Sequence, residues 1–472
     1  MKRIFLFISL ILVASVTVCA QSQDRWTILQ DGSIQWKPTR NLPHEDHVEM
    51  SGQMLSVVLR YGVDVQQRFH LNRSLVFPML RMKPNKTQNN LKQRFDVNIP
   101  AMVTVDDQTL LNEVVQDITF NGIMRVESDY GYIYRRKELK NAIHVTRILY
   151  PSINAPRYLE EYTFKNNSQN PITLRVPEWR VTYTTPEEAG VYGAYRIEAS
   201  LSKKGTFILK PGETLDFYAI YSGKKVSDDV TEKDNTAFSR ITIQSERAGR
   251  QALINQWWEN LVLDTPDPVL NRMFAFAKLR GAESIYRTKG GLMHGPGGEA
   301  YYAAVWANDQ AEYINPFFPF LGYDIGNESA LNAYRHFARY MNPEYNPIPS
   351  SIISEGVSFW HGAKDRGDGA MIAYGAARYA LARGDKEEAR ELWPLIEWCL
   401  EYCKRKLTPN GVVASNSDEL ENRFPAGDAN LCTSTLYYDA LRSAALLGRE
   451  IGVSGKQLAT YTAQAKALES AI

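Results

Sequence analysis

Cysteine is scarce in this chain, with four among 472 residues. Cys19 lies in a segment that we expect to be removed, which leaves Cys399, Cys403 and Cys432. Because the remaining number is odd, the sequence does not predict a disulfide framework. Cys399 and Cys403 lie four residues apart in the apolar stripe of an expected helix, so we expect them to pack in a hydrophobic core.

An excess of charge of one sign is also lacking, since 54 lysine and arginine residues nearly balance 53 aspartate and glutamate residues. We therefore expect no nucleic-acid partner, which would need a basic surface. The seven histidines show no His-x-x-x-His spacing, and residues 365–369 depart from the calcium-loop pattern. The sequence contains neither a phosphate-binding Gly-Lys-Ser/Thr nor a dinucleotide fingerprint. It thus predicts no metal site and no cofactor.

Long apolar runs are confined to the N-terminus, so we expect no membrane span elsewhere. Lys2 and Arg3 precede an almost continuously apolar stretch at residues 4–18. This layout is typical of a secretory signal peptide, and we expect cleavage after Ala20. Two alternatives are a lipoprotein acylated at Cys19 and an uncleaved anchor. The sequence thus predicts an exported protein, which is periplasmic, secreted or on the outer surface.

What the chain does have is length and apolar content. About 450 residues remain after cleavage, enough for two or three domains, and 44% of the chain is hydrophobic. The residue pattern changes near position 225. We expect a signal peptide at 1–20, a β-sandwich domain at 21–225, a linker with a helical segment at 226–265, and part of a helical-hairpin domain at 266–472.

The first half alternates apolar and polar residues and is rich in Val, Ile, Tyr, Phe and Thr. Short strands of this kind, separated by turn signals, predict an antiparallel sandwich. The runs lie at 54–61, 118–126, 143–150, 158–164, 172–176, 195–201 and 215–221. We expect residues 162–174 to form a hairpin across a polar turn, and residues 209–215 to form a turn between two strands.

The second half has helical periodicity. Its clearest apolar stripe combines spacings of three and four residues, at Ala389, Leu392, Ile396, Cys399 and Cys403. We expect seven helices, near 267–281, 303–321, 327–342, 369–383, 386–406, 430–448 and 456–472.

The ends of these helices carry capping signals. Asn327 and Asp368 are expected N-caps, and Gly384 is an expected C-cap. The loops at 284–302, 343–367 and 407–429 are long, and such loops usually have a function.

Three motifs lie in or beside these loops. They are Gly-Pro-Gly-Gly-Glu-Ala-Tyr-Tyr at 295–302 followed by Val-Trp-Ala-Asn-Asp-Gln-Ala-Glu-Tyr at 305–313, Phe-Trp-His-Gly-Ala-Lys-Asp-Arg-Gly-Asp-Gly-Ala at 359–370, and Asn-Ser-Asp-Glu-Leu-Glu-Asn-Arg-Phe-Pro-Ala-Gly-Asp-Ala-Asn at 416–430. Each also has a plain structural interpretation, as helix-terminal acids, core aromatics or a solvated acidic loop.

The order and spacing of these motifs resemble the six-hairpin glycosidases, the (α/α)6-barrel superfamily of glucoamylases, trehalases and maltose-phosphorylase-like enzymes. The resemblance covers residues 265–472 well and 24–225 loosely. It implies that sugar hydroxyls are held at a Trp-x-x-Asp motif, here Trp306 and Asp309. It also implies a sugar-binding Trp and an Asp-Gly helix start, here Trp360 and Asp368.

The resemblance places the general acid in the loop between the fifth and sixth helices. Glu419 is the first candidate there and Glu421 the second. Glycoside cleavage needs a protonated carboxylic acid beside the leaving oxygen and a second carboxylate that activates water or attacks the sugar. A buried glutamate would keep its proton near neutral pH, because burial raises the pKa of a carboxyl.

A six-hairpin barrel has twelve helices, and the sequence predicts seven. We therefore expect either a piece of a longer enzyme, with the second carboxylate beyond residue 472, or a barrel built differently. The predicted function is that of an exported glycoside hydrolase that acts on a carbohydrate and inverts the configuration at its anomeric carbon. Alternatives are a glycoside phosphorylase of the same fold, a polysaccharide lyase and a non-catalytic glycan-binding protein.

Overall fold

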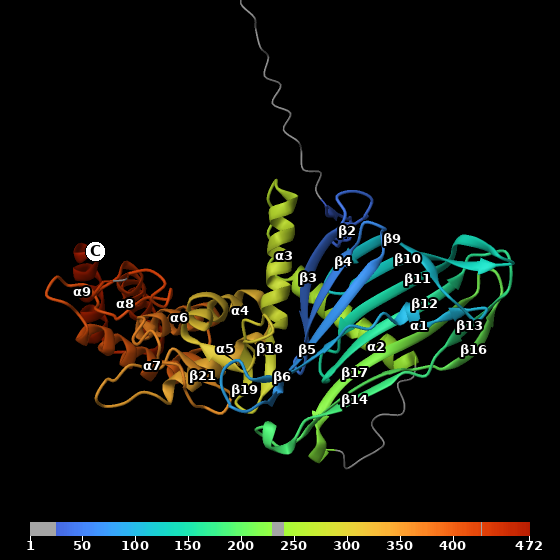
Figure 1. Cartoon of the computed structure of the whole chain (residues 1–472). Coiled ribbons are helices and arrows are strands. Elements are labelled where there is room, and N and C mark those ends of the chain that lie inside the picture. The colour runs from blue at the N-terminus through green and yellow to red at the C-terminus, as the bar shows by residue number, and fades with distance from the viewer. Residues whose placement is uncertain (1–24, 229–239, 426) are drawn as a thin grey trace, which may run out of the picture.

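The computed structural model describes residues 25–228, 240–425 and 427–472. The predicted signal peptide and Cys19 lie outside these residues. Strands occupy residues 25–225, here called the β half, and helices dominate from residue 240 on, here called the helical half. Figure 1 shows the two halves side by side with helix α3 (Pro268–Glu283) between them. The predicted order of fold types, an antiparallel β domain followed by helical hairpins, is confirmed.

The β half contains three antiparallel sheets. The largest has nine strands in the order β1-β2-β9-β10-β11-β12-β17-β15-β14, and the others are β3-β4-β5-β6 and β16-β13-β7-β8. The strands are β1 (Thr27–Ile28), β2 (Ile34–Trp36), β3 (His44–Ser51), β4 (Ser56–Val63), β5 (Phe69–Arg81), β6 (Asn90–Phe95), β7 (Thr104–Val105), β8 (Gln108–Thr109), β9 (Leu111–Phe120), β10 (Met124–Tyr134), β11 (Lys137–Pro151), β12 (Arg157–Asn166), β13 (Ile172–Val176), β14 (Arg180–Thr184), β15 (Tyr195–Leu201), β16 (Gly205–Leu209) and β17 (Thr214–Lys225).

Around β12 the nine-stranded sheet is buried on both faces. Side chains alternate along β12, so Tyr158 and Tyr162 pack in the core between the sheets. Leu159 points the other way and belongs to the core of the helical half. Helix α2 (Arg240–Glu259) contributes Ile254 and Trp257 to that same core. The long helix thus covers the outer face of the sheet.

The predicted hairpin at 162–174 is wrong. Strand β12 pairs with β11 and β17, whereas β13 pairs with β16 and β7 in another sheet. The polar turn between β12 and β13 is therefore a crossover between layers. The predicted turn at 209–215 does lie between two strands, β16 and β17, but these also belong to different sheets. Alternation identifies a strand and its buried face but does not identify its partner.

The helical half contains helices at all seven predicted places. After α3 they are α4 (Asn315–Leu321), α5 (Asp324–Ala338), α6 (Asp368–Arg383), α7 (Lys386–Arg405), α8 (Leu431–Ile451) and α9 (Gly455–Ala471). Short strands accompany them, namely β18 (Ile285–Thr288), β19 (Gly291–His294), β20 (Ala304–Trp306) and β21 (Ser351–Ile353). The apolar stripe predicted in α7 is buried, including Cys399 and Cys403.

The second predicted helix differs in its start. Its range begins with strand β20, continues as the π-helix η4 (Asp309–Ile314) and becomes α-helical only in α4. In a π-helix the hydrogen bonds join residues i and i+5, so each turn is wider than in an α-helix. Such turns are rare overall and occur frequently at functional sites.

The two predicted N-caps are wrong. Helix α5 begins at Asp324, so Asn327 lies inside it. The N-cap of α6 is Gly367, whose φ of 87° suits glycine. Asp368 follows it, and its carboxylate accepts from the side chains of Arg366 and Ser350 and from the backbone N–H of Arg366, not from the N–H groups of the first turn of α6. The expected C-cap, Gly384, is confirmed, with φ of 68°.

Buried ion pairs join the two halves at α3. Arg250 of α2 donates to Glu283 of α3 at 2.8 Å, and both side chains are nearly inaccessible to solvent. Arg280 of α3 bridges Glu283 and Glu49 of β3. We call Glu49, Arg250, Arg280 and Glu283 the junction network.

The described residues contain no candidate for a membrane span or for a metal site. None of their helices combines the length and the apolar content needed to cross a bilayer. Nor does any group of histidine, cysteine, aspartate and glutamate within them have a geometry that would hold a metal ion.

Candidate active site

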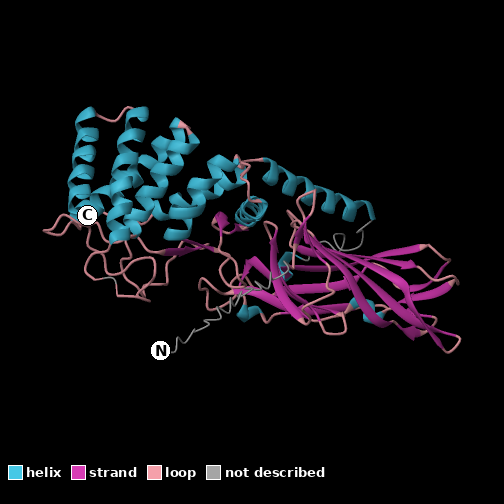
Figure 2. Cartoon of the chain, turned by 90° about the horizontal axis from the view of Figure 1, so that it is seen from above, coloured by secondary structure: helices cyan, strands magenta, loops and turns pink. Residues whose placement is uncertain are grey.

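The predicted site residues lie where the long loops of the helical half meet. Figure 2 shows these loops gathered along one edge of the row of helices. Strands β20 and β21 pair there, which brings Trp306 opposite Ser351. The π-helix η4 starts three residues after Trp306, and α6 starts at Asp368.

Arg366, which the sequence did not single out, is at the centre of the site. Its side chain is fully buried, and its guanidinium donates to Asp368 at 2.9 Å and to Glu421 at 3.2 Å. It also donates to Ser350 Oγ at 3.0 Å and to Asn308 Oδ1 at 3.3 Å. One buried cation thus connects two predicted residues that lie far apart in the sequence.

Asp309 and Asp368 both have carboxyls with a raised pKa. Burial is the largest cause for each, because a charged carboxylate loses its water. The positive charge of Arg366 acts in the opposite direction on both and limits the rise. Asp309 lies in the first turn of η4, whereas Asp368 receives a further hydrogen bond from Ser350 at 2.7 Å.

Glu312 was not chosen from the sequence, although it lies within the motif at 305–313. Burial raises the pKa of its carboxyl to about 7, and the negative charge of Glu419 adds to this rise. Its Oε1 atom is buried and has no hydrogen-bond partner among the described residues. A carboxyl with this pKa is protonated about half of the time at pH 7, and its Oε1 atom is free to bond a ligand.

Glu419 and Glu421 lie on the same loop but have different surroundings. The Tyr313 hydroxyl donates to Glu419 Oε2 at 2.7 Å. Glu421, at a positive φ of 58°, is paired with Arg366 and lies 3.6 Å from Arg423. Glu421 thus acts as a counter-ion of the buried arginine, while Glu419 lies beside Glu312. We call Asp309, Glu312, Asp368, Glu419, Glu421 and Arg366 the carboxylate cluster.

The two predicted tryptophans lie at this cluster in different ways. The Trp360 ring is stacked by the Arg366 guanidinium, with 5.4 Å between the charge and the ring centroid. Trp306 packs edge-to-face against Tyr301 at 5.4 Å. Gln88 of the β half donates to the Tyr301 hydroxyl at 2.6 Å, so the β half contributes to the support of Trp306.

One signal in the sequence pointed to Glu312 and Tyr313, which were missed. They lie three and four residues after the predicted Asp309, the spacing of one face of the α-helix expected there, although the structure forms a π-helix at these residues. Arg366 had no comparable signal, because an arginine next to two aspartates is more often exposed than buried.

Comparisons with known proteins give a likeness in structure but not in sequence. No protein-family model matches the chain, and no curated protein matches it in sequence. A solved structure provisionally named kojibiose phosphorylase, from the human microbiome, is similar with a TM-score of 0.55 and 10% identity. The match covers 94% of this chain and 70% of that one.

A bacterial glucoamylase complexed with acarbose gives a TM-score of 0.46 at 10% identity, over 92% of this chain and 68% of that one. The first likeness is to a β domain followed by helical hairpins, the fold of the six-hairpin glycosidases. At this identity it is a likeness of fold alone.

Proposed function

We propose that this protein cleaves glycosidic bonds at the carboxylate cluster by carboxylic general acid catalysis. The observation that carries the proposal is Glu312, whose carboxyl has a pKa of about 7 and a buried oxygen without a partner. Glycoside cleavage requires one carboxyl that is protonated at the working pH and a second that is ionised. The cluster combines such a carboxyl with several others in one place.

Glu312 and Glu419 form the proposed acid–base pair. The negative charge of Glu419 adds to the rise that burial causes in the pKa of Glu312. Tyr313 holds the carboxylate of Glu419 in position. In this proposal Glu312, whose pKa is raised, protonates the leaving oxygen, and Glu419 is the second carboxyl, which activates the attacking water. The resemblance had implied Glu419 as the acid and a second carboxylate beyond residue 472.

The remaining residues have proposed roles in binding. Asp309 accepts hydrogen bonds from sugar hydroxyls, and Trp306 and Trp360 supply ring surfaces for the apolar face of a pyranose.

Asp368, for which the sequence also suggested sugar binding, is buried and bonded to Arg366 and Ser350, so its proposed role is to hold Arg366 in place. Glu421 keeps Arg366 neutralised. We propose inversion at the anomeric centre, as in the enzymes that the sequence resembles.

Hydrolysis is favoured over phosphorolysis by the state of Arg366. Its guanidinium already bonds two carboxylates, which leaves little net positive charge for a phosphate ion. We also propose that the protein is exported, on the basis of its N-terminal sequence. Cell fractionation with an antibody to the chain tests export, and recovery in the cytoplasm would refute it.

The test of the reaction uses the full chain and a panel of oligosaccharides and aryl glycosides. Glu419→Gln and Glu312→Gln are each expected to lower kcat at least about 100-fold, the usual contribution of general acid–base catalysis. A dinitrophenyl glycoside, whose leaving group needs no proton, is expected to restore turnover in the variant that lacks the acid. Nuclear magnetic resonance spectroscopy of the product as first released identifies its anomeric configuration.

Glu421→Gln is the matched control on the same loop. It should change kcat little if Glu421 is only a counter-ion. Equal turnover of the wild-type protein and Glu419→Gln would contradict the proposal. A requirement for inorganic phosphate would replace hydrolysis by phosphorolysis.

A further inference from the structure

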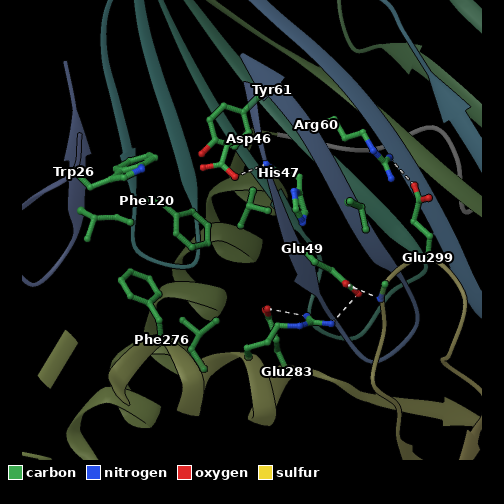
Figure 3. A pocket seen from close by; sticks show the side chains of 16 residues that line it. Trp26, Asp46, His47, Glu49, Arg60, Tyr61, Phe120, Phe276, Glu283 and Glu299 are labelled. Atoms are coloured by element: carbon green, nitrogen blue, oxygen red, sulfur yellow. Dashed lines mark hydrogen bonds and ion pairs between the residues drawn. The ribbon is translucent and has the colours of Figure 1, made fainter. Parts of the chain in front are cut away.

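A cavity of about 500 Å³ lies between the β half and α3, and no residue of the carboxylate cluster lines it. Its walls come from the N-terminal segment at Trp26, strands β3 and β4, the end of β9 and helix α3. Its volume is within the range of small-molecule sites, about 300–1,000 Å³. Figure 3 shows the side chains that surround it.

One side of the cavity is aromatic. Trp26, Phe120 and Phe276 lie together there (Figure 3), and the rings of Phe120 and Phe276 stack at 5.6 Å with only 14° between their planes. These residues come from three separate segments, so the layer of rings is a product of the fold. Phe120 and Phe276 each cover part of the other's face, and the remaining ring surface together with Trp26 forms an apolar wall of the cavity.

The other side is polar and held in place. Glu299 is bonded to Arg60 at 2.7 Å (Figure 3), and Glu49 and Glu283 both pair with Arg280. These ion pairs neutralise three of the four carboxylates that line the cavity. Rigid, paired groups of this kind can accept and donate hydrogen bonds without a large cost of ordering.

Asp46 is the fourth carboxylate and has the weakest partners. One of its oxygens accepts from the backbone N–H of His47 at 2.8 Å, and the other lies 3.8 Å from His44. Its side chain is 40% exposed and lies beside Tyr61 (Figure 3). A carboxylate and a phenol that face an aromatic layer suit a ligand with an apolar face and a rim of hydroxyls.

We propose that this cavity binds a neutral pyranose unit of a glycan, with its apolar face on the rings of Trp26 and Phe276 and its hydroxyls toward Asp46. Asp46, the one lining carboxylate without a close cation, disfavours an acidic sugar. The site requires no catalysis, so it goes beyond the proposed function. Its link to the carboxylate cluster is one loop, in which Glu299 lines the cavity and Tyr301 packs on Trp306.

The experiment is a calorimetric titration of the full chain with neutral probes, namely glucose, galactose, mannose, maltotriose, cellotriose and xylotriose. Trigalacturonic acid and choline are included as an anionic and a cationic probe. We expect at least one neutral probe to bind. Phe276→Ala and Asp46→Asn should each weaken it about tenfold, the effect of losing one ring contact or one charge-assisted hydrogen bond.

Two controls make the result specific. Phe320→Ala removes an exposed ring of α4 that lies outside the cavity, and it should leave the dissociation constant unchanged. Glu419→Gln should also leave this binding unchanged, which separates the cavity from the carboxylate cluster. Thermal melts confirm that each variant is folded.

Three results would overturn the proposal. The first is neutral-probe binding that survives both Phe276→Ala and Asp46→Asn in folded protein. The second is binding of trigalacturonic acid or choline in place of every neutral probe. The third is the absence of binding by the whole panel at millimolar concentration. None of these results bears on turnover at Glu419, so the two proposals can fail independently.

Discussion

Two groups of charges in this protein differ in composition and in how their acids are paired. The junction network has two carboxylates and two guanidinium groups, whereas the carboxylate cluster has five carboxyls and one guanidinium group. In the junction network both oxygens of Glu283 accept hydrogen bonds, from Arg250 and from Arg280. Arg250 also donates to the carbonyls of Gly122 and Ser51 at 2.9 Å each. Every group there has a partner from another segment, and the network fastens α2 and α3 to the β half.

In the carboxylate cluster not every acid is paired with a cation. Arg366 bonds Asp368 and Glu421, but Glu312 keeps a buried oxygen without a partner and a pKa of about 7. Such a group costs stability, because its ionised form is buried and unpaired. The difference teaches that acids paired with cations mark a structural role, whereas a buried acid with an unbonded oxygen marks a place where a ligand is expected to supply the partner.

The variant with the largest expected effect is one that breaks the junction network. Arg250→Ala should lower the free energy of unfolding by about 3–5 kcal/mol, because it leaves Glu283 buried with one fewer cation. Denaturant unfolding followed by circular dichroism measures the change. Arg247→Ala, on the same helix, removes an ion pair with Glu161 that is more than one-third exposed on the arginine side, and should cost less than about 1 kcal/mol. Equal losses in the two variants would show that burial of the pair does not matter.

The second prediction concerns stability at Glu312. Its folded pKa of about 7 lies above the usual value of 4.5, so the folded state holds the proton more tightly and loses stability as pH rises between these values. Glu312→Gln should therefore be more stable than the wild-type protein by about 1–3 kcal/mol above pH 7, with allowance for solvent screening. The difference should vanish below pH 4.5. Thermal melts from pH 4 to pH 8 measure it.

The matched control for this prediction is Glu387→Gln, an exposed carboxyl at the start of α7. Its stability should differ little from that of the wild-type protein throughout the same pH range. A pH-independent effect of Glu312→Gln would contradict the assignment of a raised pKa to Glu312.

The third prediction tests how Glu419 is held. Tyr313→Phe removes the hydroxyl that donates to Glu419 while keeping the ring. We expect turnover of the preferred glycoside to fall about tenfold, the effect of roughly 1.4 kcal/mol, with little change in the melting temperature. Steady-state kinetics and a thermal melt of the same preparation measure both quantities. An equal loss of stability would indicate that the tyrosine is structural.

The smallest expected effect comes from a satisfied cluster near the surface. His144 of β11 bonds Glu127 at 2.6 Å and Asp129 at 2.8 Å. The hydrogen bond to Glu127 is the largest cause of its raised pKa, and that to Asp129 adds to it. A raised histidine pKa gives stability that is fully present below about pH 6.5 and is lost as pH rises through the folded pKa.

His144→Gln should therefore cost less than about 1 kcal/mol at pH 5.5, because the site is partly exposed, and nothing at pH 9. Chemical unfolding at the two pH values measures the difference. A loss that is equal at both would mean that the ring acts through packing rather than through its charge.

The sequence alone predicted the features that depend on neighbours along the chain. The stripe from Ala389 to Cys403 has helical spacing, and the structure buries all of it. The change of period near residue 225 separated strands from helices, and Gly384 marked the end of α6. These features follow from local steric preferences and from the period of apolar residues, and both depend only on the order of residues along the chain.

Only the tertiary structure decided which strands pair and which charges meet. Strand β13 joins a different sheet from β12, although a polar turn between them suggested a hairpin. Asp368 bonds Arg366 instead of capping α6, since a guanidinium in a buried site is a stronger partner than a backbone N–H. Glu312 acquires its raised pKa from burial and from Glu419, a residue more than 100 positions away. Desolvation and long-range charge depend on three-dimensional proximity, which no local pattern in a single sequence specifies.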